Sequence, residues 1–566
     1  MSPTEVKRQL ELYQTTLTKD LDDKGWRNHW KEIRDYLLPD RGYALDDSDD
    51  SRVNSGEKRR ENIITSVAEN AIANLAAGLK SYLTTPSRPW FALSMEDTDL
   101  NQVLEIEAWL EEVTSLLHRV FNATNFYEAL HNTYIEFAGF GTGAMAIMSD
   151  EVDTIHCRAL TCGEYAIGTN QKNKVDELVR HEWMTLRNIS SQFGKENLPY
   201  QEKTFLEQGD HNAAAQRRRI FHLVVPNDGR LSVKPKGMTE DLTPWPYVSV
   251  YWMEGHADEP LHVGGFETFP YMVARWNVVG NNVYGTECPG FKELANIKGL
   301  YDMKTKEYIA AHKLIEPPVV TNGSESSINT LPGGISTGTN NMGGGMAIQP
   351  LYLIKPDMPG FELVLEKLRE EVGDGFFNNL FLMIADAEGD RKTAFEVARL
   401  QEEKMSMLGP MIEKLNTDAL EHAITRTIAI MARQNLLPEP PTDLSDTDFE
   451  IEYVSLLAQA QKTSALRSID SFMLFFQQAF QINPGIADLI DWDATVEFYR
   501  DATGSPSLLM QDPETLAAIR QAQAQQEQAA NAIQMGESLS ASAKNLSESD
   551  MGGGENALQT LLGGGA

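Results

Sequence analysis

The sequence predicts an α+β protein that is mainly helical. Apolar residues recur at helical spacing through most of the first 140 residues. Between about 143 and 276 they alternate or run together between Gly, Pro and Asn turns, as in strands. Long helical stretches return after residue 290. At 566 residues, the chain is long enough for roughly three or four domains of about 150 residues.

The first 90 residues are predicted to form a polar helix over 1–24 and two amphipathic helical blocks. One face of the first block collects the apolar residues Trp26, Trp30, Ile33 and Leu37. The second block covers 61–83 and is rich in alanine, which allows close packing on a neighbour. Pro39 ends the first block, and Pro86 and Pro89 end the second, because proline removes an amide donor and fixes φ.

Helices over 101–121 and 125–137 are predicted next, with Asn101 and Asn125 as N-caps. The period then changes to two. The predicted strands cover 144–148, 165–168, 177–186, 220–225, 247–253 and 272–276. The chain therefore passes from a helical segment into a strand-rich one near Gly143.

The middle of the chain predicts a helical hairpin. A helix over 291–313, about 35 Å long, is followed by Glu316-Pro317-Pro318. Short apolar pieces at 319–320 and 346–348 predict small strands joined by a Gly-rich loop. A second helix over 361–384 has one apolar stripe, formed by Phe361, Leu365, Leu368, Val372, Phe376, Leu380 and Met383. The two helices would form an antiparallel hairpin, with the compact segment of small strands at its tip.

The remaining third of the chain is predicted to be mostly helical. A short acidic loop over 385–391 precedes a helical region over 392–437, which Gly409-Pro410 should kink. A strand over 448–454 and helices over 460–482 and 513–540 follow. The last of these is rich in Gln and Ala, which suits packing between subunits, and the end of the chain is Gly-rich and loose.

Several motifs in this order are similar to those of a known family. They are Trp26-x3-Trp30-x2-Ile33-x3-Leu37-Leu38-Pro39, Pro86-Ser87-Arg88-Pro89-Trp90-Phe91, Gly139-Phe140-Gly141-Thr142-Gly143-Ala144, the blocks over 392–397 and 456–462, and Leu408-Gly409-Pro410. With them the chain resembles the head-to-tail connector, or portal, proteins of short-tailed double-stranded-DNA bacteriophages. Phe395 departs from the family pattern, which more often has Thr or a smaller residue there.

The resemblance implies the portal fold, with a wing, a stem helix pair, a clip and a C-terminal helical crown, assembled as a ring. It divides the chain into an N-terminal wing (1–288), first stem helix (289–315), clip (316–359), second stem helix (360–384), channel loop (385–391), kinked wing helix and C-terminal wing (392–505), crown helix (506–545) and tail (546–566).

The function that the resemblance implies is mechanical, without catalysis or a cofactor. A dodecameric ring at one capsid vertex would let double-stranded DNA pass during packaging and ejection. Its partners would be the terminase large subunit, tail adaptor or tail tube proteins, and the major capsid and scaffolding proteins. The protein would reside in the virion, and in the host cytoplasm during assembly. Two alternatives stay open: a metal-dependent DNA-processing enzyme, and a capsid or scaffold protein.

The charge of the chain favours a conduit over a general DNA-binding protein. It has 49 basic and 82 acidic residues, a formal net charge of −33. Proteins that bind duplex DNA generally neutralise phosphates with Lys and Arg, whereas an acidic surface lets DNA slide without sticking. The plainer interpretation is that an acidic protein is simply a soluble one.

The three cysteines, Cys157, Cys162 and Cys288, form neither a zinc pattern nor an even disulfide framework, so we expect a reducing compartment. The first 25 residues are polar, which argues against a signal peptide, and no apolar run approaches the ~20 residues of a membrane span.

Two sets of residues are the candidate DNA-facing sites. The channel loop contributes Asp386, Glu388, Asp390 and Arg391. Its acids are interpreted as lining a channel, as solvated loop charge, or as a Mg²⁺ or Ca²⁺ cluster that lacks a full ligand set. On the first stem helix, Lys292, Lys298, Lys306 and Lys313 fall within roughly 120° of one another. This basic face could touch DNA phosphates, pair with acids of an adjacent subunit, or be solvated.

Other motifs point to no chemistry. Gly139-x-Gly141-x-Gly143 precedes a strand and lacks the spacing of a dinucleotide site. No ATPase phosphate-binding loop occurs. Gly334-Ile335-Ser336-Thr337-Gly338 matches a serine-hydrolase string without the preceding apolar strand. His181-Glu182 lacks a second His, and Arg217-Arg218-Arg219 is interpreted as a solvated run.

Overall fold

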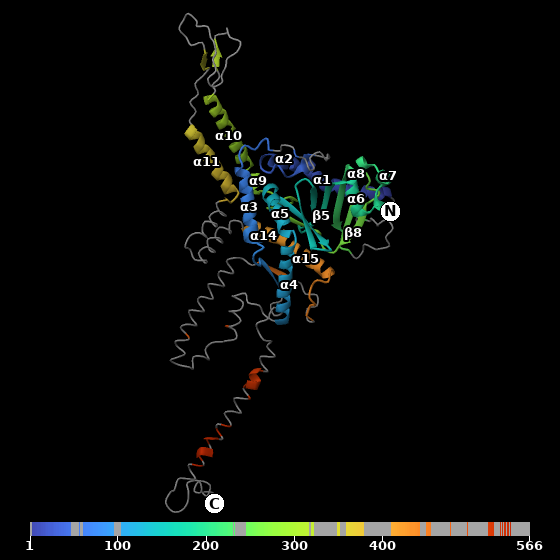
Figure 1. Cartoon of the computed structure of the whole chain (residues 1–566), viewed down its shortest axis with the longest axis vertical. Coiled ribbons are helices and arrows are strands. Elements are labelled where there is room, and N and C mark those ends of the chain that lie inside the picture. Colours follow the sequence, from blue (N-terminus) through green and yellow to red (C-terminus); the bar gives the residue numbers. More distant parts are fainter. Residues whose placement is uncertain are drawn as a thin grey trace, which may run out of the picture. The chain divides into compact units, whose positions relative to one another are not determined.

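The computed structural model describes residues 3–46, 56, 60–95, 104–229, 231, 245–315, 319–321, 348–350, 358–378, 409–441 and 449–453, together with single residues and short pieces between 476 and 544. It divides into two compact units, one formed by 1–93, 112–439 and 449–468, the other by 94–111, 440–448 and 469–566. The description below concerns mainly the first unit, which contains nearly all described elements (Figure 1).

The N-terminal helices form close to their predicted ranges, but the second block becomes helical only at Val67, and the predicted start at residue 61 is wrong. The helices are α1 (Pro3–Asp23), α2 (Trp26–Tyr36) and α3 (Val67–Leu83). Trp30 belongs to the predicted apolar face of α2. It is 2% exposed and packs edge-on against Tyr284, with ring centroids 5.2 Å apart. The alanine-rich face of α3 is buried where this helix packs on α5 (Phe126–Phe140). The two blocks therefore help to form the core of the first unit.

Helices α4 (Leu104–Ala123) and α5 lie close to their predicted ranges, and Asn125 occupies the predicted N-cap position of α5, but its side chain does not cap the helix. The Asn125 side chain bonds no helical amide; its amide donates to the Cys157 carbonyl (2.7 Å) and its oxygen accepts from the Cys157 amide (2.9 Å). Asn125 thus ties the start of α5 to strand β3 (Thr154–Leu160). Asn101 lies outside the described residues.

The strand-rich region forms two antiparallel sheets. A three-stranded sheet has the order β3-β2-β9, with strands β2 (Thr142–Asp150), β3 (Thr154–Leu160) and β9 (Tyr271–Arg275). A five-stranded sheet has the sequential order β4-β5-β6-β7-β8, with strands β4 (Tyr165–Thr169), β5 (Val175–Thr185), β6 (Arg217–Pro226), β7 (Tyr247–Met253) and β8 (His262–Phe266). All six predicted strands are present, whereas β3 and β8 escaped prediction. Helix α5 packs on β2 and β3.

Three short helices between β5 and β6 have no counterpart in the prediction. They are α6 (Leu186–Phe193), α7 (Tyr200–Glu207) and α8 (His211–Ala215). Together with the edge of the five-stranded sheet they enclose a small apolar core of Leu186, Ile189, Leu198, Ile220, Met253 and Leu261. Asp210 caps α8 by accepting from the amides of Asn212 and Ala213.

The Gly-rich motif at the end of α5 allows two backbone segments to pack closely; we call it the glycine joint. Gly141 ends α5 at φ +78°, and a Cβ there would lie 2.5 Å from the Gly285 carbonyl oxygen. A Cβ on Gly290 would lie 2.1 Å from the Gly139 carbonyl oxygen. Because backbone contacts backbone at both points, side chains are excluded sterically. The motif joins α5 to the segment that leads into the helical hairpin.

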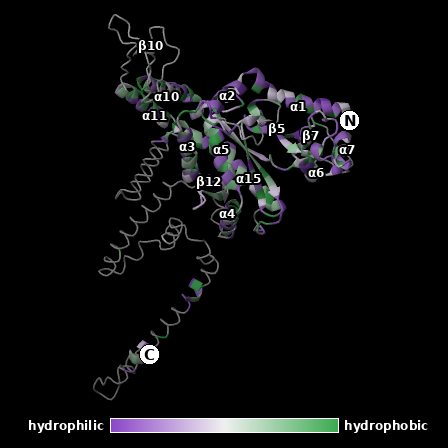
Figure 2. Cartoon of the chain, turned by 45° about the horizontal axis from the view of Figure 1, so that its top comes forward, coloured by the Kyte–Doolittle hydropathy of each residue, from purple (hydrophilic) through white to green (hydrophobic). Residues whose placement is uncertain are grey.

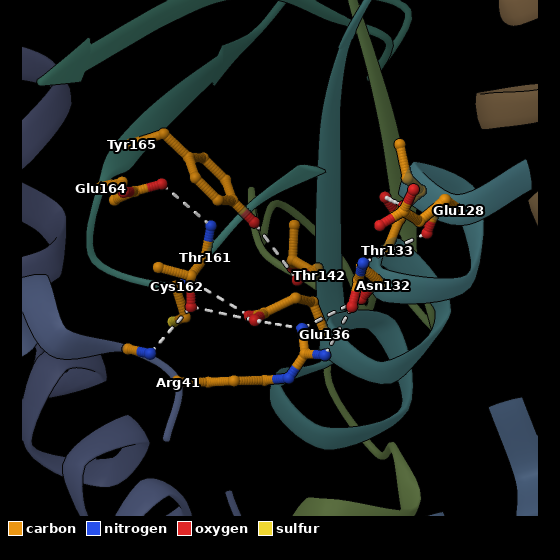
Figure 3. A network of polar contacts seen from close by, with 12 residues as sticks. Arg41, Glu128, Asn132, Thr133, Glu136, Thr142, Thr161, Cys162, Glu164 and Tyr165 are labelled. Atoms are coloured by element: carbon orange, nitrogen blue, oxygen red, sulfur yellow. Dashed lines mark hydrogen bonds and ion pairs between the residues drawn. The ribbon is translucent and has the colours of Figure 1, made fainter. Parts of the chain in front are cut away.

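A buried carboxylate fastens the loop after α2 to the sheets (Figure 3). Glu136 of α5 is 1% exposed and accepts from the Arg41 guanidinium (3.1 Å), the Thr161 hydroxyl (2.9 Å) and the Cys162 amide (3.0 Å). Burial raises the pKa of Glu136, while Arg41 opposes that shift. Nearby, Glu164 accepts from the Tyr43 hydroxyl and the Thr161 amide, and burial raises its pKa to about 7. We call this cluster the Glu136 network.

The predicted helical hairpin is present with different limits. The first helix is short: α9 covers Pro289–Lys292 and ends at Glu293. A new helix, α10, then covers Leu294–Ile315. Strands β10 (Val319–Thr321) and β11 (Ile348–Pro350) pair antiparallel, and α11 (Met358–Gly375) returns. The prediction that the second helix continues to 384 is wrong within the described residues, because it ends at Gly375 and Phe377 has φ 57°. We call α10 and α11 the stem hairpin.

The helical region after residue 408 deviates from α-helix at a different place from the one predicted. Gly409-Pro410 begins α14 (Gly409–Leu415), and a five-residue π-helical turn (Asn416–Leu420) separates α14 from α15 (Glu421–Arg433). Asp418 in this turn pairs with the fully buried Arg275 of β9 (2.9 Å). Strand β12 (Phe449–Tyr453), predicted over 448–454, pairs with β1 (Phe91–Met95). Residues 379–408, and most of the predicted helix over 460–482, lie outside the described residues.

Candidate functional site

The two helices of the stem hairpin meet closely at their base. A Cβ built on Gly375 would lie 2.2 Å from the Cδ atom of Glu293, so the Glu293 side chain occupies the space that a larger residue would need. Asn296 donates to Glu293 Oε2 (2.8 Å), which holds that side chain in place. Since Glu293 directly precedes α10 and Gly375 ends α11, the helices run antiparallel and side by side (Figure 1).

The lower part of α10 is anchored on α2. Lys298 pairs with Glu32 (2.8 Å) and lies over the Tyr36 ring, 5.1 Å from its centroid. The Tyr301 hydroxyl donates to the Tyr36 carbonyl oxygen (3.1 Å). The hydrogen bond from Lys298 lowers the pKa of Glu32, which keeps this carboxylate charged for the ion pair. The stem hairpin is therefore attached to the N-terminal helices as well as to its own base.

The four lysines of the predicted basic face have unequal surroundings. Lys298 is used in the contact with α2, and Lys306 pairs with Asp302 on its own helix (2.6 Å). Lys292 lies on α9, separated from the others by the interruption at Glu293. Lys292 and Lys313 are exposed and have no hydrogen bond or ion pair with any residue that the structure describes. The exposed lysines of α10 itself are thus Lys306 and Lys313.

Helix α11 has one buried edge and a largely exposed remainder. Leu365 is 1% exposed and Val372 is fully buried, as the predicted apolar stripe requires. Glu362, Glu366 and Glu370 are exposed and follow one another at intervals of four residues. They form an acidic stripe along α11, in contrast to the lysines of α10.

Large apolar side chains are exposed on both stem helices. They are Tyr308, Ile309, Leu314 and Ile315 on α10 and Leu363 and Val364 on α11. Leu363 is 69% exposed and Ile315 78% exposed. Figure 2 shows hydrophobic and hydrophilic residues mixed along both helices. Single exposed apolar residues are ordinary, but a group of them on neighbouring helices indicates a surface that another molecule covers.

The predicted channel-loop residues Asp386, Glu388, Asp390 and Arg391 lie outside the described residues, as does the hydrolase-like string over 334–338. Their roles therefore stay predictions. In the part of the chain that the structure describes, no group of three or more His, Cys, Asp and Glu side chains is placed to hold a metal ion. Within the same residues, no helix is both long and apolar enough to span a bilayer.

The interpretation of Arg217-Arg218-Arg219 as a solvated run is wrong. These residues begin β6 and are half-buried. Arg218 pairs with Glu202 of α7 (2.9 Å), and Arg219 lies over the Phe221 ring and 3.6 Å from Glu254. They tie the small helices to the sheet. His181 and Glu182 are structural as well, since Glu182 lies between the guanidinium groups of Arg158 and Arg180.

Sequence reasoning missed the surface of α11 and the exposed apolar residues. The spacing of Glu362, Glu366 and Glu370 was visible in the sequence and could have revealed the acidic stripe. The exposure of Leu363 could also have been expected, because Leu363 lies off the predicted apolar stripe that contains the buried Leu365.

Comparisons with known proteins agree with this architecture. The family model described as bacteriophage head to tail connecting protein matches residues 16–510. The chain is 32% identical over 551 residues to the portal protein of Salmonella phage epsilon15, covering 97% of this chain and 96% of that protein. It is also 32% identical over 512 residues to the probable portal protein of Bordetella phage BPP-1, covering 90% and 89%. This chain therefore belongs to the family of bacteriophage head-to-tail connecting proteins.

Proposed function

We propose that copies of this chain form a closed portal ring at one vertex of a phage capsid, with twelve copies as its family resemblance implies. The stem hairpins would stand side by side around a pore through which double-stranded DNA is packaged and later ejected. The observation that carries the proposal is the full-length similarity to portal proteins, together with a stem hairpin whose outer surface is apolar and charged in patches.

The exposed residues of the stem hairpin support ring formation. Leu365 and Val372 are buried, whereas Leu363, Val364, Tyr308 and Ile309 remain accessible in the single chain. Burying apolar surface contributes roughly 25 cal/mol per Å², so covering such side chains with neighbouring copies would stabilise an assembly. Repeated head-to-tail contacts generate a ring when the rotation between copies closes.

The charge of the chain supports passage of DNA without tight binding. Twelve copies at −33 each would carry −396 formal charges. Phosphates that slide past acidic walls retain their counterions, whereas basic walls would release them and hold the DNA. In this proposal the acids of the channel loop, Asp386, Glu388 and Asp390, face the pore, and Arg391 lies beside them.

The partners in this proposal follow from the stages of assembly. The ring would nucleate the head with the major capsid and scaffolding proteins, then offer the clip over 316–359 to the terminase large subunit, and afterwards bind tail adaptor or tail tube proteins. The ATPase that drives packaging would be the terminase, and the ring itself would not catalyse a reaction. The protein would thus act in the host cytoplasm during assembly and remain in the virion.

Sedimentation velocity and negative-stain electron microscopy of the purified full-length chain test the proposal. We expect closed rings with a central hole. A monomer at all protein concentrations would overturn it, and closed shells would instead indicate a capsid or scaffold protein. Incubation with duplex DNA and Mg²⁺ tests the remaining alternative, because cleavage that is lost in Asp386→Ala would identify a nuclease.

A double variant tests the channel loop separately. We expect Asp386→Ala with Glu388→Ala to form rings like the wild type but to change how much DNA a packaging reaction retains. Failure of this variant to form rings would make the loop structural and would contradict its placement in the channel.

A further inference from the structure

The two helices of the stem hairpin carry opposite net charges. Helix α10 has four lysines and two acids, whereas α11 has five acids and two basic residues. Their formal net charges are therefore +2 and −3, with His312 counted as neutral. The difference is concentrated on exposed positions: Lys306 and Lys313 of α10, and Glu362, Glu366 and Glu370 of α11.

These charges form stripes along the two helices. Glu362, Glu366 and Glu370 recur every four residues and so remain on one side of α11. Lys306 and Lys313 are seven residues apart, about two turns, and Ile309 lies between them on the same side of α10. Each stripe thus lies near one exposed apolar residue: Ile309 on α10, and Leu363 on α11.

The two stripes reach the same height at one pair of residues, Lys306 and Glu362. Lys313 stands seven residues higher on α10, and Glu366 and Glu370 stand nearer the base on α11. The base of the hairpin is fixed by the contact between Glu293 and Gly375. Lys306 is 13 residues above Glu293 on α10, and Glu362 is 13 residues above Gly375 on α11, about 20 Å along each helix. In a ring, copies stand parallel, so residues of equal height on adjacent copies come to the same level.

We propose that the basic stripe of α10 in one copy packs against the acidic stripe of α11 in the next copy, with Lys306 opposite Glu362 and with Ile309 and Leu363 forming the apolar centre of the contact. This inference rests on the proposed ring and names the surface that joins its subunits. It assigns Lys306 to the contact between copies and not to DNA phosphates.

Opposite charges at this contact would fix the direction of assembly. A like pairing, α10 on α10 or α11 on α11, places equal charges face to face, so the head-to-tail arrangement is the one that both stripes favour. Charges at the edge of an interface contribute more to specificity and association rate than to affinity. The assembly should therefore weaken as salt is added, since exposed charges are screened within about 8–10 Å at physiological ionic strength.

Charge reversal of each stripe tests the pairing. The first variant is Lys306→Glu, and the second is Glu362→Lys. We expect each alone to shift the protein concentration for half-maximal ring formation upward by on the order of tenfold or more, because its rings would place like charges together. The matched control for the first variant, Lys172→Glu, makes the same change of charge at an exposed position outside the stem hairpin.

Two rescue experiments make the test specific. A chain that carries both substitutions restores opposite charges at every contact and should form rings at the wild-type concentration. An equimolar mixture of the first and second variants should also form rings, in which the two kinds of copy alternate. Circular dichroism of each variant establishes that the subunit is folded, and sedimentation velocity measures assembly.

The outcomes separate this inference from the proposed function. Loss of rings in both single-stripe variants, with recovery in the double variant and in the mixture, would support the pairing. Rings as stable as the wild type in either single-stripe variant, or loss without recovery, would overturn it. Intact rings with altered DNA retention in the lysine variant would assign the basic stripe to DNA. A wild-type chain that forms no rings would overturn the proposed function itself.

Discussion

Charged residues are buried around the Glu136 network and exposed on the stem hairpin. Around the network and the sheets, Glu136, Arg275 and Glu164 are each at most 5% exposed, and every one has hydrogen-bond partners within the chain. In the stem hairpin, Lys313, Glu366 and Glu370 are exposed, and apolar residues such as Leu363 are exposed as well. The buried polar groups stabilise the subunit, whereas those on the stem hairpin are available to other molecules.

The largest expected effect concerns the buried ion pair between Arg275 and Asp418. Arg275→Met removes two hydrogen bonds to Asp418 and one of 2.6 Å to the Asn173 carbonyl, and it leaves Asp418 partly uncompensated. We expect a loss of about 3–5 kcal/mol in the free energy of unfolding, measured by chemical denaturation. The control is Arg60→Met, because its partners Asp40 and Glu69 form a surface cluster whose loss should cost less than about 1 kcal/mol. Equal losses in the two variants would show that the buried ion pair of Arg275 contributes no more to stability than the surface pairs of Arg60.

Two neighbouring leucines of α11 test the comparison within a single helix. Leu365→Ala should destabilise the subunit by about 2–5 kcal/mol, because the side chain is 1% exposed and its removal leaves a cavity. Leu363→Ala should change subunit stability by less than about 0.5 kcal/mol, since that side chain is 69% exposed. Thermal unfolding of both variants, at a concentration where the protein is monomeric, makes the measurement. A large loss from Leu363→Ala would mean that the exposed face belongs to the subunit core.

The pH dependence of stability should report on Glu164. Burial raises its pKa from about 4.5 to about 7, so the folded protein binds more protons than the unfolded chain between these values. The contribution of Glu164 to stability is therefore fully present below pH 4.5 and is lost as the pH rises to 7, by up to about 3 kcal/mol.

The measurement compares wild type with Glu164→Gln, because several buried histidines, among them His181 and His422, have lowered pKa values and change stability in the opposite direction with pH. We expect the stability difference, wild type minus variant, to decrease between pH 4.5 and 7. A constant difference over this range would show that Glu164 keeps its ordinary pKa.

The smallest of the four effects concerns the glycine joint between α5 and the stem segment. Gly141→Ala should cost about 2 kcal/mol or more, since φ is +78° and the new Cβ would lie 2.5 Å from the Gly285 oxygen. Gly25→Ala has a similar φ of +79° with no atom within 4 Å, so it should cost only the conformational term of about 1–2 kcal/mol. Equal costs in equilibrium unfolding would exclude a steric role for the joint.

The sequence predicted helices and strands well where the hydrophobic periodicity was strong. It failed where contacts between distant segments determined the role of a side chain or the end of an element. The face of α2 and the stripe of α11 follow from helical spacing, and Val372 is fully buried as predicted. The side chain of Asn125 has the chemistry of a helix cap, yet it bonds Cys157 on a strand 32 residues away. The end of α11 at Gly375 also escaped prediction, because no proline marks it and the apolar stripe continues to 383 in the sequence.

The sequence by itself determined the mixture of helices and strands, the out-and-back stem hairpin and the family, since these depend on periodicity, proline placement and ordered motifs. The tertiary structure alone decided which charges are buried and which face outward. Arg275 and Arg60 are the same residue type, but only the fold places one beside Asp418 in the interior and the other at the surface. Burial arises from contacts between distant segments, and local spacing carries no information about those contacts.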